Sequence, residues 1–295
     1  MTQKRNTQYE IMASHNLAHI KIDDLEIIGY SVAGEETVVA MPQLDVCFDV
    51  GKAPDQIIPI NHILLTHGHM DHAAGIAYYL SQRNFCGQSA GTILAPQNLL
   101  GPIREIIGAW GRLDGNPIPA NIVGVSPGDE YQIKPNLFTR VFPTKHSPGS
   151  VGYSVIEKRK KLRPEFSKLT GPQIVELKKQ HIEIDYPVEL PIVTYFGDTQ
   201  YVDFSQLKYI AESRILIAEC TFYQDEHTGR AEAGKHIHID EFVALLNKMQ
   251  NEHIIITHTT QRTPMWEIRR ILKDALPPEK YDKTILLMDK CIRPS

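Results

Sequence analysis

Residues 64–75, LLTHGHMDHAAG, constrain this sequence more than any other stretch. Directly after an apolar run they place three imidazoles and one carboxylate, at His67, His69, Asp71 and His72. These groups are costly to bury as bystanders, and they are ligands that divalent metals bind. His67 ends a predicted strand and His69 follows in a turn, so both can face one ion. Asp71 and His72 enter a predicted helix and can face a second, which predicts half of a two-metal hydrolytic site.

A metal pair needs more ligands than this stretch supplies, and three candidates follow later β-type runs. His146 follows LFTRVFPTK, Asp198 closes TYFGD, and His258 follows HIIIT. Each lies at the carboxyl end of a predicted strand, where α/β proteins gather their sites. Asp198 has two carboxylate oxygens, so it is the natural bridge between two cations. Four other histidines follow no such pattern and are interpreted as structural: His62, His181, His227 and His253.

The order of apolar runs predicts one α/β domain. Residues 1–18 are polar and unpatterned, which is typical of a disordered N-terminal arm. From residue 19 to residue 295, short β-type runs come first and strand–helix alternation follows. This order fits mixed sheets covered by helices on their outer faces. The pattern breaks at a charged insertion, about residues 158–191, before PIVTYFGDT resumes the sheet.

Composition excludes several other classes of protein. No apolar run approaches the roughly 18 residues that a membrane span needs, and the first residues lack an apolar signal core, so we expect a cytoplasmic protein without membrane contact. The four cysteines lie far apart without a Cys-x-x-Cys pair, which argues against a disulfide framework or a thiolate zinc site. The formal net charge of −4 argues against a basic coat over the whole surface.

Charge is nevertheless unevenly distributed. Between residues 158 and 181 there are eight Lys or Arg and two Glu, a net +6, so the rest of the chain carries −10. A basic lobe on an acidic body favours contact with a phosphate backbone, with an affinity that falls as salt rises. A solvated insertion without function is the alternative. The predicted substrate contacts are Lys158, Arg159, Lys160, Lys161, Arg163, Lys178 and Lys179.

Taken together, the motif and the three later ligands resemble the metallo-β-lactamase superfamily, whose fold is an αββα sandwich. Within it, KHSPGSVGYSVIEK, YFGDT, AECTF and KHIHIDEF follow in the order typical of ribonuclease Z (tRNase Z), the endonuclease that removes the 3′ trailer from precursor tRNA. The likeness is strongest to the short, plant-type form, whose arm resembles KLRPEFSKLTGPQIVELKKQHIEI. It runs from about Leu25 to the C-terminus.

This resemblance implies a single metallo-β-lactamase-like domain over residues 19–295, with the insertion acting as an exosite that clamps tRNA across a homodimer. It also implies two Zn²⁺ per chain, with Mn²⁺ or iron as alternatives, and precursor tRNA as the partner. Two cations can lower the pKa of a shared water and neutralise charge on the scissile phosphate. Asp71 is placed to orient or deprotonate that water.

The leaving 3′ oxygen needs a proton, and the resemblance implies that His236, the first histidine of KHIHIDEF, is a catalytic residue. His238 is the alternative donor. Glu219, at the end of RILIAE, would raise the pKa of the imidazole and hold its tautomer. The structural alternatives are a helix N-terminus with Asp240 near its cap, and a buried ion pair for Glu219.

The sequence also departs from ribonuclease Z. Nothing matches the Pro-x-Lys-x-Arg-Asn loop at the corresponding position, and residues 259–261, TTQ, stand where Phe-Ser is usual. We therefore keep two rivals to a tRNA 3′-processing endonuclease. One is a hydrolase of a small-molecule phosphodiester, lactone or sulfate ester. The other is a non-catalytic RNA-binding protein with structural zinc.

Overall fold

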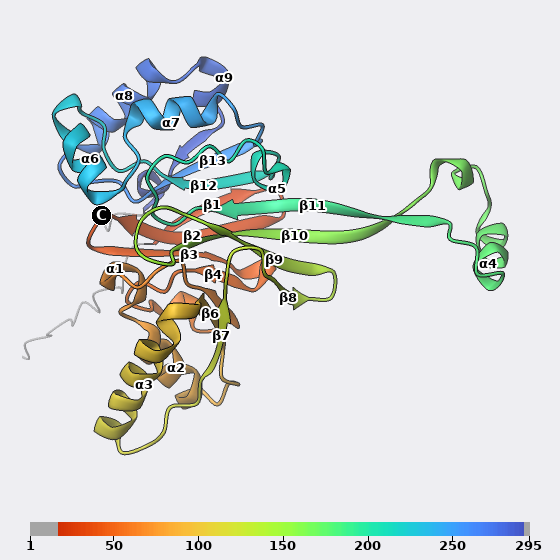
Figure 1. The fold of residues 1–295 in the computed structure, drawn as a ribbon, viewed down its shortest axis with the longest axis horizontal. Coiled ribbons are helices and arrows are strands. Elements are labelled where there is room, and N and C mark those ends of the chain that lie inside the picture. The colour runs from red at the N-terminus through yellow and green to blue at the C-terminus, as the bar shows by residue number, and fades with distance from the viewer. Residues whose placement is uncertain (1–16, 292–295) are drawn as a thin grey trace, which may run out of the picture.

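The computed structural model describes residues 17–291 of the 295-residue chain. In this part of the chain two seven-stranded sheets pack face to face, with helices on both outer faces (Figure 1). The predicted αββα sandwich of two mixed sheets is therefore confirmed. Most of the N-terminal arm expected at residues 1–18 lies outside the described residues, and the first strand begins at Ala18.

The first sheet has an antiparallel half and a parallel half. Its neighbours are antiparallel from β1 to β4 and parallel from β4 to β7. The strands are β1 (Ala18–Ile22), β2 (Leu25–Val32), β3 (Glu36–Met41), β4 (Val46–Phe48), β5 (His62–Leu64), β6 (Thr92–Pro96) and β7 (Asn121–Val125). The helices that follow β5 and β6 are α1 (Met70–Ala73), α2 (Ile76–Phe85) and α3 (Leu100–Asp114).

The second sheet repeats this plan. Its neighbours are antiparallel from β8 to β11 and parallel from β11 to β14. The strands are β8 (Glu130–Lys134), β9 (Leu137–Pro143), β10 (Val151–Leu162), β11 (Asp185–Tyr195), β12 (Ile215–Glu219), β13 (His253–Thr257) and β14 (Thr284–Leu286). Its helices are α5 (Lys208–Ala211), α6 (Thr228–Gly234), α7 (Ile239–Leu246), α8 (Met265–Ala275) and α9 (Pro278–Tyr281).

Short 3₁₀ helices connect several of these elements: η1 (Pro42–Leu44), η2 (Asp55–Ile57), η3 (Gln97–Leu99), η4 (Pro164–Phe166), η5 (Asp225–His227) and η6 (Leu287–Lys290). Throughout residues 17–291, no helix combines the length and the apolar content that crossing a membrane requires. Parallel strands place their carboxyl ends at one edge of a sheet, so both sheets can present side chains at the same edge of the sandwich.

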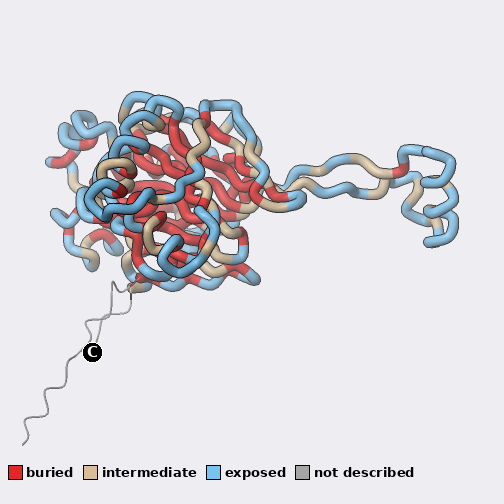
Figure 2. The backbone as a smooth tube through the Cα atoms, turned by 90° about the horizontal axis from the view of Figure 1, so that it is seen from below, coloured by how far each residue is buried: buried red, intermediate tan, exposed pale blue. Residues whose placement is uncertain are grey.

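Three apolar layers hold the sandwich together. The middle layer lies between the sheets, where the rings of Phe48 and Tyr195 meet at 4.9 Å between centroids. The outer layers lie under the helices, as where Phe242 and Leu245 of α7 pack on the second sheet. Burying such a side chain stabilises the fold by roughly 1.5–3 kcal/mol. Figure 2 shows these buried residues concentrated in the body of the molecule.

The charged insertion forms an arm that projects from the body (Figure 1). Strands β10 and β11 continue past the sheet and pair with each other, with Lys158 opposite Glu189 and Leu162 opposite Asp185. The tip carries η4 and α4 (Gly171–Lys179). Polar side chains dominate this paired segment, so no alternation of apolar residues marks it as strand. The strands therefore run several residues further into the insertion than the sequence pattern indicates.

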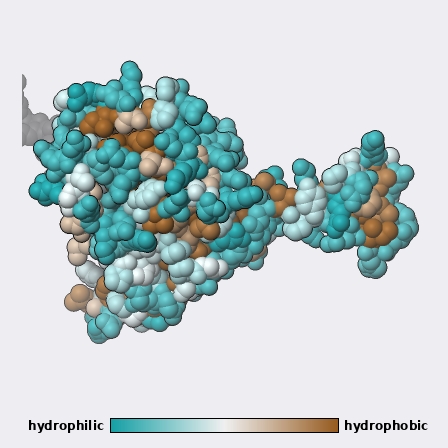
Figure 3. Space-filling model, turned by 45° about the horizontal axis from the view of Figure 1, so that its top comes forward, coloured by the Kyte–Doolittle hydropathy of each residue, from teal (hydrophilic) through white to brown (hydrophobic). Residues whose placement is uncertain are grey.

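The surface of the arm is largely exposed, as Figure 2 shows. Hydrophobic side chains nevertheless gather at its tip (Figure 3). There Val175 is 53% exposed and Ile182 is 41% exposed. The arm is therefore both basic and partly apolar at its end.

Candidate metal centre

The seven residues predicted as metal ligands lie together at one edge of the sandwich. Four come from the segment between β5 and α2, and the others follow β9, β11 and β13. They form two groups in which the possible ligand atoms lie within 4.8 Å of one another. One group is His67, His69, His146 and Asp198, and the other is Asp71, His72 and His258.

Asp198 joins the two groups. Its Oδ2 atom lies 3.2 Å from Nε2 of His258 and 3.3 Å from Nε2 of His72. The same oxygen lies 3.7 Å from Nε2 of His146 and 3.8 Å from Nε2 of His67. Burial alone would raise the pKa of Asp198, but the neighbouring imidazoles of His258 and His72 hold it well below its usual range. One carboxylate oxygen therefore faces both groups as an anion.

Three imidazoles in the cluster have an unsatisfied nitrogen. The Nε2 atoms of His67, His72 and His258 are buried and have no hydrogen-bond partner among residues 17–291. Leaving a buried polar atom unpaired costs free energy, whereas an Nε2 lone pair is the group that a metal ion binds. The donor set of imidazoles and carboxylates without a thiolate suits divalent metals. The residues present thus fit a metal cofactor.

Asp49 supports this cluster and is the residue that the sequence analysis missed. Its buried carboxylate lies 2.8 Å from Nδ1 of His72 and accepts a hydrogen bond of 2.9 Å from the Thr66 hydroxyl. The Thr66 oxygen lies 3.0 Å from Nδ1 of His67, which assigns the proton of that ring to Nδ1. A signal was present, because Asp49 closes the apolar run VCF much as Asp198 closes TYF.

Burial and neighbouring charges shift the pKa values of two of these rings in opposite directions. Burial, assisted by the positive form of His72 nearby, lowers the pKa of His67 well below its usual value. Burial also opposes protonation of His72, but the carboxylates of Asp198 and Asp49 outweigh it and raise the pKa of His72 well above its usual value. The two rings therefore respond in opposite directions to their surroundings.

Glu219 anchors the other side of the cluster. Its buried carboxylate accepts hydrogen bonds from the backbone N–H of Thr199 at 2.6 Å and from the Thr221 hydroxyl at 2.5 Å. Nδ1 of His236 lies 3.1 Å from its Oε2 atom. Burial alone would lower the pKa of His236, but the Glu219 carboxylate outweighs it and raises that pKa to about 9. His236 is therefore protonated at neutral pH in the metal-free protein.

His236 borders both ligand groups. Its ring stacks on His258 with centroids 5.0 Å apart and lies 4.8 Å from the ring of His146. His238 instead caps α7, because its Nδ1 accepts the backbone N–H of Asp240 and its Nε2 lies 3.2 Å from the carbonyl oxygen of Gln224. The structure brings His236, rather than His238, to the cluster. The helix-cap alternative describes His238.

The predicted substrate contacts all lie on the arm, and the structure divides them into two kinds. Four form ion pairs with nearby carboxylates: Lys158, Arg159, Arg163 and Lys178. The other three have no ion pair with any described residue, and neither does Lys168. Between residues 158 and 190 eight Lys or Arg accompany five Asp or Glu, a net +3, because residues 182–190 add three acids. The arm is less basic than the count to residue 181 suggests.

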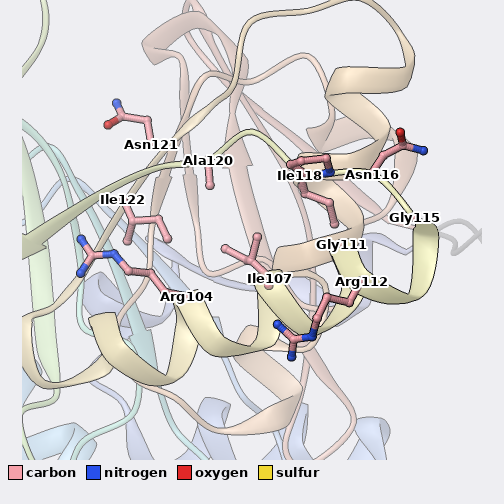
Figure 4. Close-up of a pocket in the computed structure, with 12 residues that line it drawn as sticks. Arg104, Ile107, Gly111, Arg112, Gly115, Asn116, Ile118, Ala120, Asn121 and Ile122 are labelled. Carbon is pink, nitrogen blue, oxygen red and sulfur yellow. The ribbon is translucent and has the colours of Figure 1, made fainter.

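A groove of about 730 Å³ lies elsewhere, between α3 and the edge strand β7 (Figure 4). Arg104 and Arg112 flank it, and Gly108 and Gly111 form part of its wall. It contains none of the clustered histidines or aspartates. Cavity size alone therefore does not locate the metal centre, which is found by the convergence of ligand atoms.

Comparison with known proteins places this geometry in a family. Residues 37–259 match the family described as Beta-lactamase superfamily domain. The chain is 31% identical to tRNase Z TRZ1 of Arabidopsis thaliana over 263 residues, which cover 88% of this chain and 93% of that protein. The human short-form tRNase Z structure aligns with TM-score 0.57 and 17% identity, covering 88% of this chain and 93% of that one. The metallo-β-lactamase fold protein YhfI of Bacillus subtilis aligns with TM-score 0.61 and 13% identity, covering 87% and 93%. These two structures share the fold, and the chain belongs to the β-lactamase superfamily and, within it, to the tRNase Z family.

Proposed function

We propose that this protein is a metal-dependent phosphodiesterase that removes the 3′ trailer from precursor tRNA and leaves a 3′ hydroxyl on the tRNA. The observation that carries the proposal is the Oδ2 atom of Asp198, which lies 3.2–3.8 Å from Nε2 atoms of imidazoles in both ligand groups. Two cations can be held side by side there. The relatives named tRNase Z support precursor tRNA as the substrate.

In this proposal two Zn²⁺ ions bind per chain, with Mn²⁺ or iron as alternatives. The first metal position takes His67, His69 and His146, and the second takes Asp71, His72 and His258. Asp198, whose Oδ2 atom faces imidazoles of both groups, would be shared between the two positions. Bound cations of this kind lower the pKa of a shared water and neutralise charge that develops on the phosphate.

The protein's own residues handle the protons. Asp71 orients the attacking water and accepts its proton. Glu219 holds Nδ1 of His236, so Nε2 of the protonated ring is the donor. As the phosphorus–oxygen bond to the 3′ oxygen breaks, this proton neutralises the leaving oxygen. A cavity of about 380 Å³, lined by His236, Tyr201 and Gln200, leaves room for substrate beside the ring.

The direction of the arm supports a homodimer that acts in trans. Strand β10 begins shortly after His146, and β11 ends shortly before Asp198, so one end of each strand lies at the metal centre and the other end carries the arm. The 12 residues of β10 span about 40 Å. The arm therefore points away from its own centre (Figure 1). A tRNA held by one arm can be cleaved by the partner subunit.

Exposed apolar side chains on α2 and α3 offer a surface for such an association. Trp110 is 55% exposed, Leu113 is 77% exposed and Tyr78 is 48% exposed. Tyr78 and Trp110 line one shallow pocket between the two helices. Apolar patches of this kind are typical of protein–protein contacts.

The direct test is an in vitro cleavage assay. The purified full chain, incubated with a precursor tRNA that lacks CCA and with Zn²⁺ or Mn²⁺, should cut at the discriminator boundary, and a chelator should abolish the cut. His236→Ala should slow the chemical step by about a hundredfold or more while the metal content stays at that of the wild type. His253→Ala, which changes a histidine outside the cluster, is the matched control. No cleavage where a known tRNase Z cuts would sink the proposal.

A hydrolase of a small-molecule phosphodiester, lactone or sulfate ester remains the second candidate. The observation that favours it is the ion pairing of four of the seven predicted RNA contacts. If shortening the arm leaves turnover of the natural substrate unchanged, the arm does not bind the substrate. That result would favour the small-molecule hydrolase over the tRNA endonuclease. The cytoplasmic location stays a prediction, which imaging of the tagged full chain would test.

A further inference from the structure

We propose that Glu35, on the turn between β2 and β3, is a positioning residue for the second metal position. This inference rests on the two-position centre proposed above. The Glu35 carboxylate is exposed, and no contact joins it to the candidate ligands among the described residues. It acts through the turn on which it lies, and that turn reaches the ligand Asp71.

The contact between the turn and Asp71 is a backbone hydrogen bond. The N–H of Gly34 donates to Oδ2 of Asp71 at 2.9 Å. Gly34 has φ +73°, a left-handed conformation that glycine adopts without strain. The turn is closed by a hydrogen bond of 3.0 Å from the N–H of Glu35 to the carbonyl oxygen of Val32. The position of the Asp71 carboxylate therefore depends on the position of this turn.

Glu35 clamps the turn to the loop that follows β13. Its Oε1 atom accepts a hydrogen bond of 2.8 Å from the Tyr30 hydroxyl, and its Oε2 atom accepts one of 2.7 Å from the Gln261 side-chain amide. Glu35 and Gln261 are 226 positions apart in the chain and belong to opposite halves of the sandwich. We call this pair of side-chain hydrogen bonds, from Tyr30 and Gln261 to Glu35, the clamp. Beside it, the N–H of Ala33 donates a backbone hydrogen bond of 3.1 Å to the carbonyl oxygen of Thr259.

The same loop carries His258, another ligand of the second position. The backbone N–H of His258 donates to the hydroxyl oxygen of Ser31 at 2.8 Å, so strand β2 also holds this ligand. Thus Asp71 and His258, which come from different sheets, are both attached to one hairpin. The contacts of the hairpin described here do not include the first-position ligands. Removing the clamp should therefore weaken one metal position selectively.

The test is a metal titration of the metal-free full chain with Zn²⁺, followed by calorimetry and competition with a chelator. In Glu35→Ala one of the two stepwise affinities should fall by about 3–10-fold, the effect of losing hydrogen bonds of ordinary net strength, while the other stays within about twofold. Glu35→Gln should recover most of that affinity, because the Gln261 amide can rotate to accept from the new amide. Glu26→Ala, which removes a half-buried carboxylate from the other end of β2, should bind both ions as the wild type does.

Each outcome decides between explanations. The inference would be overturned if Glu35→Ala left both affinities unchanged or lowered both by the same factor. It would also be overturned if Glu35→Gln lowered the affinity as much as Glu35→Ala does, because the charge of Glu35 and not its hydrogen bonds would then be responsible. If Glu35→Ala does not fold, Gln261→Ala decides, with a selective decrease of several-fold supporting the clamp and no decrease overturning it. A wild-type protein that binds fewer than two ions would contradict the proposed function itself, which separates the two failures.

Discussion

Asp49 and Glu219 have parallel roles in the two sheets. Each buried carboxylate accepts a hydrogen bond from a threonine hydroxyl, Thr66 in one case and Thr221 in the other. The threonine oxygen in turn faces Nδ1 of a candidate ligand. The proton on Nδ1 leaves the Nε2 lone pair free for a metal ion. Such outer contacts fix the tautomer and the direction of an imidazole ligand. The centre therefore depends on residues that do not themselves belong to the ligand set.

Asp49→Asn should weaken metal binding by about 10–100-fold, the usual effect of removing an outer-shell carboxylate. The amide keeps the size of the side chain but cannot accept from both Thr66 and His72. The measurement is the Zn²⁺ affinity of the metal-free protein, with thermal unfolding to verify the fold. Asp45→Asn is the control, because the Asp45 carboxylate pairs with Asn61 outside the cluster. Wild-type affinity in Asp49→Asn would rule out this role.

The proton on His236 should depend on Glu219. In the metal-free protein the pKa of His236 is raised to about 9, so the ring is charged at neutral pH and loses its proton as the pH rises through about 9. The stabilisation from the charged pair is present below the ordinary histidine pKa and is lost over that rise. In Glu219→Gln burial should dominate, and the pKa should fall below its wild-type value.

Nuclear magnetic resonance titration of the His236 ring in metal-free protein measures this shift. Glu26→Gln, a carboxylate change at the far end of β2, should leave the titration of His236 unaltered. If the ring of the wild type titrates at the ordinary histidine value, Glu219 does not hold its proton.

At the scale of elements, the arm is a hairpin in which some basic side chains form ion pairs and others do not. The ladder between β10 and β11 brings carboxylates of the return strand beside several of the basic side chains. An exposed ion pair adds little stability, usually below about 1 kcal/mol, but it lowers the charge that a phosphate meets. The unpaired lysines are therefore the stronger candidates for contact with RNA.

Replacing two unpaired lysines, Lys161→Ala with Lys179→Ala, should raise KM for precursor tRNA. It should also reduce the slope of log affinity against log salt by about 0.7–0.9 for each lysine that touches a phosphate in the complex. Turnover of a small chromogenic phosphodiester should not change. The control, Arg159→Ala with Arg163→Ala, removes the same net charge from paired residues and should reduce the slope less. Equal salt slopes in the two double variants would contradict the view that unpaired lysines contact RNA more than ion-paired arginines do.

At the scale of the whole molecule, the two sheets share one plan. The loops after β5, β11 and β13, together with the loop between the antiparallel strands β9 and β10, bring the candidate ligands to the same edge. The strands that end at this edge also build the arm at the opposite end. Because of this arrangement, a subunit cannot present its own arm tip to its own metal centre without bending β10 and β11. In the homodimer proposed above, this geometry would favour cleavage of a tRNA held by the arm of the other subunit.

Mixing two inactive variants tests this arrangement. One lacks the arm tip, residues 163–184, and the other carries His236→Ala with an intact arm. After subunit exchange, random pairing should restore about a quarter of wild-type cleavage of precursor tRNA, since half of the dimers are mixed and each has one complete pair. If mixed dimers form and cleavage does not return, the arm does not act in trans.

Much of this architecture can be read from the sequence, because strands and their ends leave local signals. The motif at residues 67–72 shows four candidate ligands, three His and one Asp, at close spacing, and Asp198 and His258 each follow an apolar run. The resemblance of these segments to a known family also predicted that two sheets pack together between outer layers of helices. The clamp at Glu35 leaves no such signal, because its partners are ordinary polar residues in distant segments.

What the sequence determined by itself is the set of chemical groups and the strand ends on which they lie, since both follow from local spacing and hydrophobic alternation. Only the tertiary structure decided that one oxygen of Asp198 faces both ligand groups, that His236 and not His238 meets Glu219, and that half of the arm's cations are paired. These outcomes depend on how two sheets pack and on which side chains meet across the ladder. Such contacts join residues far apart in the chain, so local spacing does not encode them.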